Sequence, residues 1–513
     1  MQVYKIEEKH QGANSLLVFL FIVAAIALRL YIIYFPFRLY EYLVPPGGDP
    51  VGHIGLINQI LQGGISSNYP TLFHLIIAFL SRIFGSDPIS VLKSVTPAMM
   101  VLPSIGIYIF LKKSYGKLAA LIGFMISLFA SNYALVAFGD GNYPNILASG
   151  FFIPIAFAFV LKALDKKSFK NYFWAVIFTI LLLLTHHLSF ATFLIILIAY
   201  LIILSFWNKY EKIAVSPTKF TFAFLVLIGI LVIATILTPL REPMLGAINA
   251  LLQSGAVAGQ ISFSYPIDFA DYGSMVGPLV YFGGLLALFY LVYMLGLDNE
   301  EINKKAVLFV IVWFVILFVL SRLNCTGLPG RFARELALPL LGAISISLSH
   351  IFSKYKHNLQ KIVALGLLGM IVAACLVQVN GGSYSSPKYY NSMVWFTKSD
   401  LEKADYIKWV TEEDDVILSN RTTPYMSIFT KRKFVYNTEQ FLKSQGAFQS
   451  FAKNNGAKYL FIGKITSADP DPVAYPFFNG FDAGTLKMQE LASELTKVHE
   501  FSDGSVLYSF VDF

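Results

Sequence analysis

The stretch VPPGGDPVGHIGLINQILQGG, residues 44–64, follows directly after the first long apolar run of the chain, residues 14–36. It combines a Gly/Pro-rich start with Asp49 and, four residues later, His53. From Pro50 onward its apolar residues recur at helical spacing, which predicts a helix with one apolar face. The role of this stretch depends on the side of a membrane on which it lies, and the rest of the sequence indicates that side.

The composition is that of a membrane protein followed by an ordinary soluble segment. Of the 513 residues, 56% are hydrophobic and only 14% are charged, whereas soluble domains carry about a quarter charged residues. Apolar runs of roughly 18–24 residues, each long enough to cross the hydrocarbon core of a bilayer, recur as far as residue 379. The net charge of +8 comes mostly from short loops between these runs and does not indicate nucleic-acid binding. The two cysteines exclude a disulfide framework, and no Walker-type glycine loop supports ATP-driven transport.

The apolar runs predict a polytopic α-helical domain over residues 1–379 with about eleven transmembrane helices, followed by an α/β domain over residues 380–513. The predicted spans are 14–36, 89–111, 118–138, 145–163, 172–185, 187–207, 219–239, 275–296, 304–321, 335–352 and 361–379. The first two spans are separated by a long loop, residues 37–88. Within it, the segments 50–62 and 69–85 are predicted to be helices that lie along the membrane surface.

Lysines are distributed unevenly between alternate loops. The lysine-rich loops contain Lys5, Lys9, Lys112, Lys113, Lys117, Lys162, Lys166, Lys167, Lys170, Lys209, Lys212, Lys219, Lys304, Lys305, Lys354, Lys356 and Lys361. The other loops are poorer and contain Arg38, Arg82, Lys93, Arg241, Arg322, Arg331 and Arg334. By the positive-inside rule the lysine-rich side is cytoplasmic. We therefore expect a cytoplasmic N-terminus, with loop 37–88 and the C-terminal domain outside the membrane. If residues 69–85 formed a further span, the loops that follow would lie on the opposite sides of the membrane. The lysines would then no longer be concentrated on one side.

The C-terminal domain has the pattern of a small α/β unit. A capped helix is predicted at 399–410, strands at DVILS (415–419) and KYLFIG (458–463), and between them a helix that ends at Gly456. A closing hairpin is predicted around Asp503 and Gly504. The domain has no cluster of residues typical of a catalytic centre, so we expect it to cap an external cavity, to contact an acceptor, or to serve as a scaffold.

Several motifs accompany this architecture. They are GGDPVGH with Asp49 and His53, YPTLFHLIIAFLSRIFGSDP (69–88), FGDGNYPNILASGFF (138–152), LLLLTHHLSF (181–190) and GRFARELALPLL (330–341). Together with the long first external loop and its two surface helices, they resemble the GT-C superfamily of membrane glycosyltransferases. That superfamily includes oligosaccharyltransferases, protein O-mannosyltransferases and lipid A aminoarabinose transferases. The resemblance covers about residues 1–379.

The resemblance implies transfer of a sugar from a polyprenyl-phosphate or diphosphate carrier to a glycan, lipid or protein acceptor on the outer face of the plasma membrane. It also implies that an acidic residue of the first external loop acts as a base or metal ligand. The WWDYG signature of oligosaccharyltransferases is absent; FADYG (269–273) shares three letters but precedes a span. This difference favours transfer of a single sugar from a polyprenyl-phosphate donor. With the resemblance, it leads us to expect an inverting transferase of hexosyl or pentosyl units.

Asp49 is the leading catalytic candidate. An aspartate before a proline at the start of a helix is also a good N-cap, and a capping carboxylate at the membrane surface could still accept a proton from an acceptor hydroxyl. His53 lies one helical turn away, so it could face the same site and bind substrate. Asp49, His53 and Asp140 could together hold a divalent metal such as Mg²⁺ or Mn²⁺. Asp140 in an Asp-Gly pair could instead be a turn residue.

The remaining candidates are expected to bind the substrate. Paired histidines at a membrane boundary, His186 and His187, need polar partners or face the substrate cavity. External arginines bind phosphate oxygens well, which makes Arg331 and Arg334 candidates for the carrier phosphate and Arg241 a weaker one. Snorkelling, or pairing of the arginines with Glu335, is the alternative for these side chains. Tyr69, which precedes a proline, is expected to line the cavity.

A flippase or other transporter of lipid-linked sugars is the competing function. Transporters place ionisable groups near the middle of the membrane and often contain internal repeats. Here acidic residues stay out of the centres of the predicted spans, and no repeat is apparent. A receptor with an external binding domain would not need so many spans. The sequence therefore favours the enzyme.

Overall fold

The protein is described by a computed structural model that covers residues 11–39, 42–45, 49–64, 69–166, 168–210, 268–269, 271–296, 303–323, 329–354, 396–419, 424–435, 445–463, 492 and 495–510. The predicted spans 219–239 and 361–379, and Arg241, lie outside the described residues.

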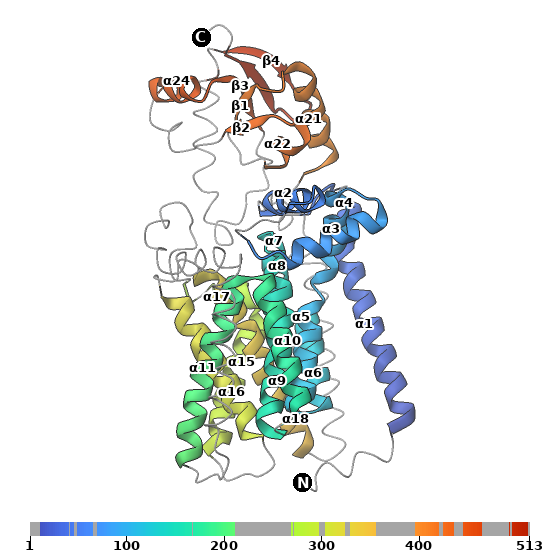
Figure 1. Cartoon of the computed structure of the whole chain (residues 1–513), viewed down its shortest axis with the longest axis vertical. Helices are drawn as coiled ribbons and strands as arrows, with labels where there is room; N and C mark the ends of the chain where they lie inside the picture. The colour runs from blue at the N-terminus through green and yellow to red at the C-terminus, as the bar shows by residue number, and fades with distance from the viewer. Residues whose placement is uncertain are drawn as a thin grey trace.

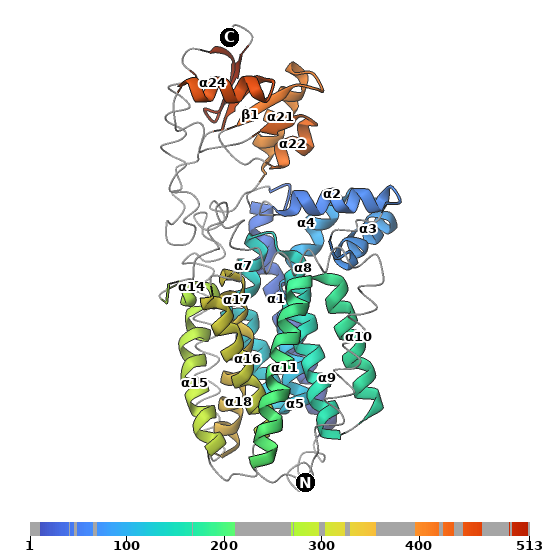
Figure 2. The same ribbon diagram turned by 60° about the vertical axis from the view of Figure 1, so that its left-hand side comes forward.

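A helical bundle makes up most of the described structure (Figures 1 and 2). Eight segments of the described part of the chain are long and apolar enough to cross a membrane. They are α1 (Gln11–Leu39), α4–α5 (Pro88–Met99 and Leu102–Ser114), α6–α7 (Lys117–Ala130 and Tyr133–Gly139), α8–η3–α9 (Tyr143–Asn145, Ile146–Phe152 and Ile153–Lys166), α11 (His187–Tyr210), α15 (Pro278–Gly296), α16 (Lys304–Arg322) and α17–α18 (Pro329–Glu335 and Ala337–Lys354). A shorter apolar helix, α10 (Phe169–Thr185), occupies the place of the predicted span 172–185. The chain is a multi-pass membrane protein, and each described span coincides with a predicted one.

The two helices predicted between the first spans are present and lie across one end of the bundle (Figure 1). They are α2 (Asp49–Leu61) and α3 (Leu72–Phe84), and they pack against each other. Ile54, Ile57 and Ile77 are fully buried, whereas Phe79 and Phe84 on α3 are exposed apolar side chains. One face of this helix pair therefore packs on the protein, and exposed aromatic residues remain on α3, as expected for a surface helix.

The fourth spanning segment changes from an α-helix to a π-helix where it meets α5. Its residues Ile146–Phe152 form a π-helix, η3, between α8 and α9, and short π segments in α-helices often occur at functional sites. Gly106 of α5 allows the close approach, because a Cβ atom there would lie 2.6 Å from the carbonyl oxygen of Gly150 and 3.1 Å from Cα of Phe151. The backbones of α5 and η3 are thus in direct contact.

The C-terminal domain contains a five-stranded sheet with the order β2-β1-β3-β5-β4. Its elements are α21 (Lys398–Val410), β1 (Val416–Ser419), α22 (Pro424–Thr430), β2 (Lys433–Val435), α24 (Gln445–Asn454), β3 (Ala457–Ile462), β4 (Thr496–Glu500) and β5 (Val506–Ser509). Strands β2, β1 and β3 are parallel, whereas β3, β5 and β4 are antiparallel. The helices at 398–410 and 445–454, the strands β1 and β3, and the closing hairpin match the prediction, whereas β2 and α22 were not predicted.

Residues 42–45, which precede α2, form hydrogen bonds with the C-terminal domain. Tyr425 of α22 donates a hydrogen bond from its hydroxyl to the carbonyl oxygen of Pro45 at 2.6 Å. The backbone N–H of Leu43 donates to the carbonyl oxygen of Phe396 at 2.9 Å. The C-terminal domain therefore contacts the chain just before Asp49, at the end of the bundle where α2 and α3 lie (Figure 1).

The contact between α5 and η3 can be tested with two Gly→Ala substitutions. Gly106→Ala places a methyl group against backbone atoms that cannot turn away, so we expect it to lower the free energy of unfolding by about 1–3 kcal/mol. Gly55→Ala is the matched control, since no atom lies within 4 Å of its Cβ position and alanine favours an exposed helix by about 0.5–1 kcal/mol. Thermal unfolding of the purified variants should therefore change in opposite directions. Equal stability of the two variants would contradict the close approach.

Candidate active site

The loop of residues 140–142 lies directly against the start of α2. Gly141 has a φ of +77°, and a Cβ atom at this position would lie 2.5 Å from Cδ of Pro50 and 3.3 Å from Cβ of Asp49. The Nε2 atom of His53 lies 3.2 Å from the carbonyl oxygen of Gly141. The structure thus brings together Asp49, His53 and Asp140, the three residues that the sequence proposed for one site.

Asp140 forms an ion pair with an arginine that lies 194 positions later in the sequence. Nη1 of Arg334, on α17, donates to Oδ2 of Asp140 at 2.7 Å, and Nη2 donates to Oδ1 of Asn145 at 3.2 Å. The Arg334 side chain is 0% exposed and that of Asp140 is 15% exposed. Burial raises the pKa of the Asp140 carboxyl, and the two neighbouring arginines partly offset this effect. Arg334 therefore positions Asp140 and is not free to bind a phosphate in this arrangement.

Arg331 lies one turn before Arg334 on α17 and is only partly buried. With the Asn142 amide oriented so that its oxygen faces the guanidinium, that oxygen accepts from Nη2 at 3.1 Å and from Nε at 3.3 Å. The positive charge of Arg331 also acts on Asp49 and Tyr69. Of the two predicted arginines that the structure describes, Arg331 and Arg334, Arg331 is the one that could contact a phosphate near Asp49.

Asp49 is exposed at the first residue of α2. Among the residues that the structure describes, none donates a hydrogen bond to its carboxylate, so the side chain is not used as a helix cap there. The surrounding protein raises the pKa of the Asp49 carboxyl by desolvation, and the charges of Arg331 and Arg334 lower it by a smaller amount. An uncommitted carboxylate with a raised pKa can accept a proton from an acceptor hydroxyl.

His53 is buried in a cluster with a second histidine, His74, that the sequence reading missed. Its Nδ1 lies 3.0 Å from Nε2 of His74, and Nδ1 of His74 lies 3.2 Å from the carbonyl oxygen of Pro70. The ring of Tyr69 packs against both histidines, with centroids 6.2 Å and 5.3 Å away. Burial lowers the pKa of His53 to about 4 and that of His74 to about 3, so both are neutral at pH 7. These histidines fix α2, α3 and the 140–142 loop to one another.

A second polar cluster lies below the loop, where α17, η3 and α11 meet. Oε1 of Glu335 accepts from Nδ2 of Asn145 at 3.0 Å and from Oγ of Ser149 at 2.8 Å. The Oγ atoms of Ser149 and Ser189 lie 2.7 Å apart, and Oγ of Ser189 lies 2.7 Å from Nδ1 of His186. His186 is thus a buried member of this cluster, whereas its neighbour His187 is partly exposed.

The predicted metal ligands do not form a complete coordination set. Both ring nitrogens of His53 face other groups, and Asp140 is paired with Arg334. Among the described residues, no group of three or more His, Cys, Asp or Glu side chains could hold a metal ion. Of the three predicted ligands, only Asp49 has a carboxylate without a partner among the described residues, and dependence on Mg²⁺ or Mn²⁺ stays a prediction from the sequence.

The sequence identified most of the residues at this site but not their partners. His74 lies within the quoted YPTLFHLIIAF segment, and its place in a mostly apolar helix could have singled it out. Asn145, also inside a quoted motif, needs a polar partner because it is buried in a spanning segment. Nothing in the local sequence indicates that Ser149 and Ser189 meet.

No protein-family model matches the chain, and no curated protein matches it in sequence. Solved structures match along nearly its whole length. The oligosaccharyltransferase of Archaeoglobus fulgidus, tethered to an acceptor peptide, aligns with a TM-score of 0.62 and 14% identity over 95% of this chain and 74% of its own. ArnT from Cupriavidus metallidurans, bound to undecaprenyl phosphate, aligns with a TM-score of 0.52 and 13% identity over 97% of this chain and 98% of its own.

A third similar structure is the mycobacterial arabinofuranosyltransferase AftD, with a TM-score of 0.53 and 12% identity over 95% of this chain and 40% of its own. This chain has the GT-C fold. The A. fulgidus enzyme has also been solved in complex with Zn and sulfate, with a TM-score of 0.57 to this chain. At these sequence identities the likeness concerns the fold, and the resemblance predicted from the GGDPVGH and FGDGNYP motifs is confirmed at that level.

The contact of Gly141 with α2 gives a second pair of substitutions. Gly141→Ala strains a left-handed backbone, by about 1–2 kcal/mol, and also drives a methyl group into Pro50. Gly85→Ala, at the end of α3, is the control, because its φ is also positive, +58°, but no atom lies within 4 Å of its Cβ position. We expect Gly141→Ala to lower the unfolding temperature clearly more than Gly85→Ala. An equal loss would show that α2 does not rest on this loop.

The buried histidines predict an acid-sensitive fold. Unfolding returns His53 and His74 to an ordinary pKa of about 6.5, so the unfolded chain binds more protons than the folded one below that pH. Their contribution to stability is complete above about pH 6.5 and is lost as the pH falls toward 4, the approximate pKa of His53 in the folded protein. We expect the unfolding temperature to fall over this range, and to fall less steeply in His74→Phe. Parallel curves for wild type and variant would contradict this assignment.

Proposed function

We propose that this protein is a glycosyltransferase that moves a single sugar from a polyprenyl-phosphate carrier to an acceptor at the outer face of the plasma membrane. The observation that carries the proposal is the uncommitted carboxylate of Asp49, beside Arg331 and the Asp140–Arg334 ion pair, in a GT-C fold. Structures with this fold include an arabinofuranosyltransferase and ArnT bound to undecaprenyl phosphate. The acceptor is a glycan, a lipid or a protein.

The reaction in this proposal is a direct displacement. The acceptor hydroxyl would attack the anomeric carbon, form the new C–O bond and lose its proton to Asp49. The bond between that carbon and the phosphate oxygen would break on the opposite side, which inverts the configuration. The departing polyprenyl phosphate would keep the bonding electrons, and Arg331 is the partly exposed cation placed to stabilise its charge.

Two buried groups would support this step without contacting the sugar. The ion pair between Arg334 and Asp140 holds the 140–142 loop in place. His53 and His74 anchor the start of α2, so Asp49 stays at a fixed distance from the loop. The orientation proposed from the lysine distribution, with a cytoplasmic N-terminus, places this site and the C-terminal domain outside the cell.

The decisive substitution is Asp49→Asn, which keeps the shape of the side chain and removes its basicity. With a panel of radiolabelled polyprenyl-phosphate sugars and purified membranes, we expect wild type to transfer one of them and Asp49→Asn to lose roughly 100-fold or more of the rate. Asp268→Asn is the control, since Asp268 is an exposed aspartate outside the site, and it should retain full transfer.

The outcomes separate the competing ideas. Equal transfer by wild type and Asp49→Asn would leave the enzyme standing but remove Asp49 as its base, and Asp140 would become the next candidate. Absence of transfer from every donor, with a protein that accumulates and folds normally, would favour the flippase.

A further inference from the structure

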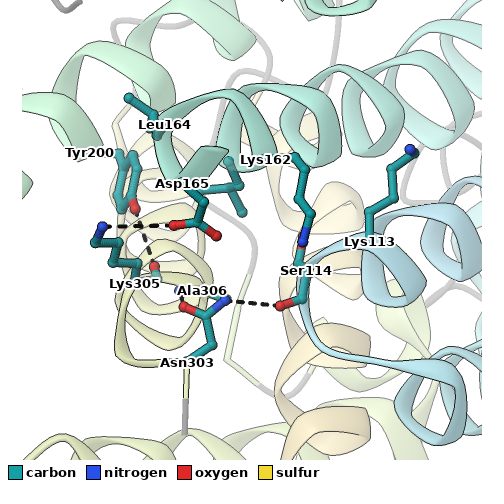
Figure 3. A pocket seen from close by; sticks show the side chains of 10 residues that line it. Lys113, Ser114, Lys162, Leu164, Asp165, Tyr200, Asn303, Lys305 and Ala306 are labelled. Carbon is teal, nitrogen blue, oxygen red and sulfur yellow. Dashed lines mark hydrogen bonds and ion pairs between the residues drawn. The ribbon is translucent and has the colours of Figure 1, made fainter. Parts of the chain in front are cut away.

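A cationic recess lies at the end of the bundle opposite to α2 and α3, where α5 and α9 end and α16 begins (Figures 1 and 3). The lining side chains are those of Lys113, Ser114, Leu161, Lys162, Leu164, Asp165, Tyr200, Asn303, Lys305 and Ala306. Nδ2 of Asn303 donates to the carbonyl oxygen of Ser114 at 3.0 Å. The hydroxyl of Tyr200 donates to the carbonyl oxygen of Lys305 at 3.2 Å. These hydrogen bonds between helices hold the walls of the recess in place.

The positive charge in the recess exceeds the negative charge. Asp165 is the only acidic residue among the lining residues, and its Oδ1 lies 3.7 Å from Nζ of Lys305. Lys162 has no ion-pair or hydrogen-bond partner among the described residues. Lys113 experiences the repulsion of Lys162 and of two further lysines, Lys112 and Lys170. An anion in the recess would relieve this repulsion.

A buried hydroxyl group also lacks a partner there. Ser114 is 9% exposed, and its Oγ makes no hydrogen bond to any residue that the structure describes. A buried polar group without a partner costs about 1–3 kcal/mol. A ligand oxygen in the recess could accept a hydrogen bond from this hydroxyl while the lysines bind its charge. Ammonium groups together with a hydroxyl form a suitable donor set for a phosphate group.

An aromatic surface lies beside Lys113, one of the lining residues. Nζ of Lys113 lies 4.2 Å from the centre of the Phe159 ring, and that ring stacks on Trp174 at 6.2 Å. Trp174 is 38% exposed, and Phe173 beside it is 50% exposed. Aromatic side chains are enriched at membrane boundaries, so a molecule held by the lysines would have apolar protein surface next to it for acyl chains.

We propose that this recess binds the phosphate of an anionic phospholipid, with the headgroup between Lys113, Lys162 and Ser114 and the acyl chains along α9 and α10. Basic pockets between transmembrane helices are known to bind such headgroups. The site is distinct from the candidate active site, which lies at the other end of the bundle. Its occupant is a component of the bilayer, and it does not depend on the sugar donor or on Asp49.

The test uses the full-length protein in mild detergent, with thermal unfolding and native mass spectrometry as readouts. Dioleoyl phosphatidylglycerol, dioleoyl phosphatidylcholine and inorganic phosphate are added separately. We expect phosphatidylglycerol to raise the unfolding temperature of the wild type and to remain bound, and phosphatidylcholine to do so less. Lys162→Gln should bind phosphatidylglycerol about fivefold more weakly, whereas Lys117→Gln, which removes an exposed lysine outside the recess, should behave as wild type.

Ser114→Ala gives an independent check, because it removes the unpartnered hydroxyl. We expect this variant to be more stable than wild type without lipid and to gain less from phosphatidylglycerol. An equal response to phosphatidylglycerol in Lys162→Gln and Lys117→Gln would overturn the site. Stabilisation by inorganic phosphate as strong as that by phosphatidylglycerol would overturn the lipid as its occupant.

Discussion

The ion pair between Arg334 and Asp140 connects the helical bundle to the surface site. A fully buried guanidinium without a partner would cost several kcal/mol, so Arg334 requires the carboxylate that lies 2.7 Å away. This requirement fixes the 140–142 loop on α17. The loop in turn contacts Pro50 and His53 through Gly141, and the position of Asp49 follows from those contacts. The need to pair the buried charge of Arg334 therefore determines the position of the exposed Asp49 carboxylate.

The buried polar cluster next to the 140–142 loop also reflects the need of buried polar groups for partners. Within the membrane, backbone and side-chain polar groups must find partners in the protein. Asn145 and Ser149 both donate to Glu335, and Ser149 also reaches Ser189. Residues 145 and 149 flank the start of η3, whose wider turn differs from the regular helices on either side. The irregular segment is therefore found where side chains of three spanning segments must meet, and not in the apolar middle of the bundle.

The spans, the two surface helices and most of the C-terminal elements could be predicted because each depends on local composition and periodicity. Strand β2 could not, since its three residues are held by pairing with β1 and not by their own pattern. At the site, too, the sequence indicates what depends on local pattern and misses what depends on contacts between distant segments. Asp49, His53, Asp140 and Arg334 stand out as polar residues in unusual places, but the sequence offered the adjacent Glu335 as a partner for the arginines. The actual partner of Arg334 is 194 positions away, and only the packing of α17 on the 140–142 loop reveals it.

The buried ion pair is better explained by geometry than by stability. Desolvation of two charges offsets most of their attraction, and apolar replacements of such pairs are often no less stable. An apolar pair would, however, have no preferred direction, whereas the Arg334 guanidinium holds one oxygen of Asp140 and the amide of Asn145 at fixed angles. Since Gly141 and Asn142 of the same loop contact Asp49 and Arg331, the directional contact constrains where these two side chains lie relative to each other. The transfer that we propose needs a base and a leaving-group site at a set spacing, and a directional contact meets that need better than additional stability would.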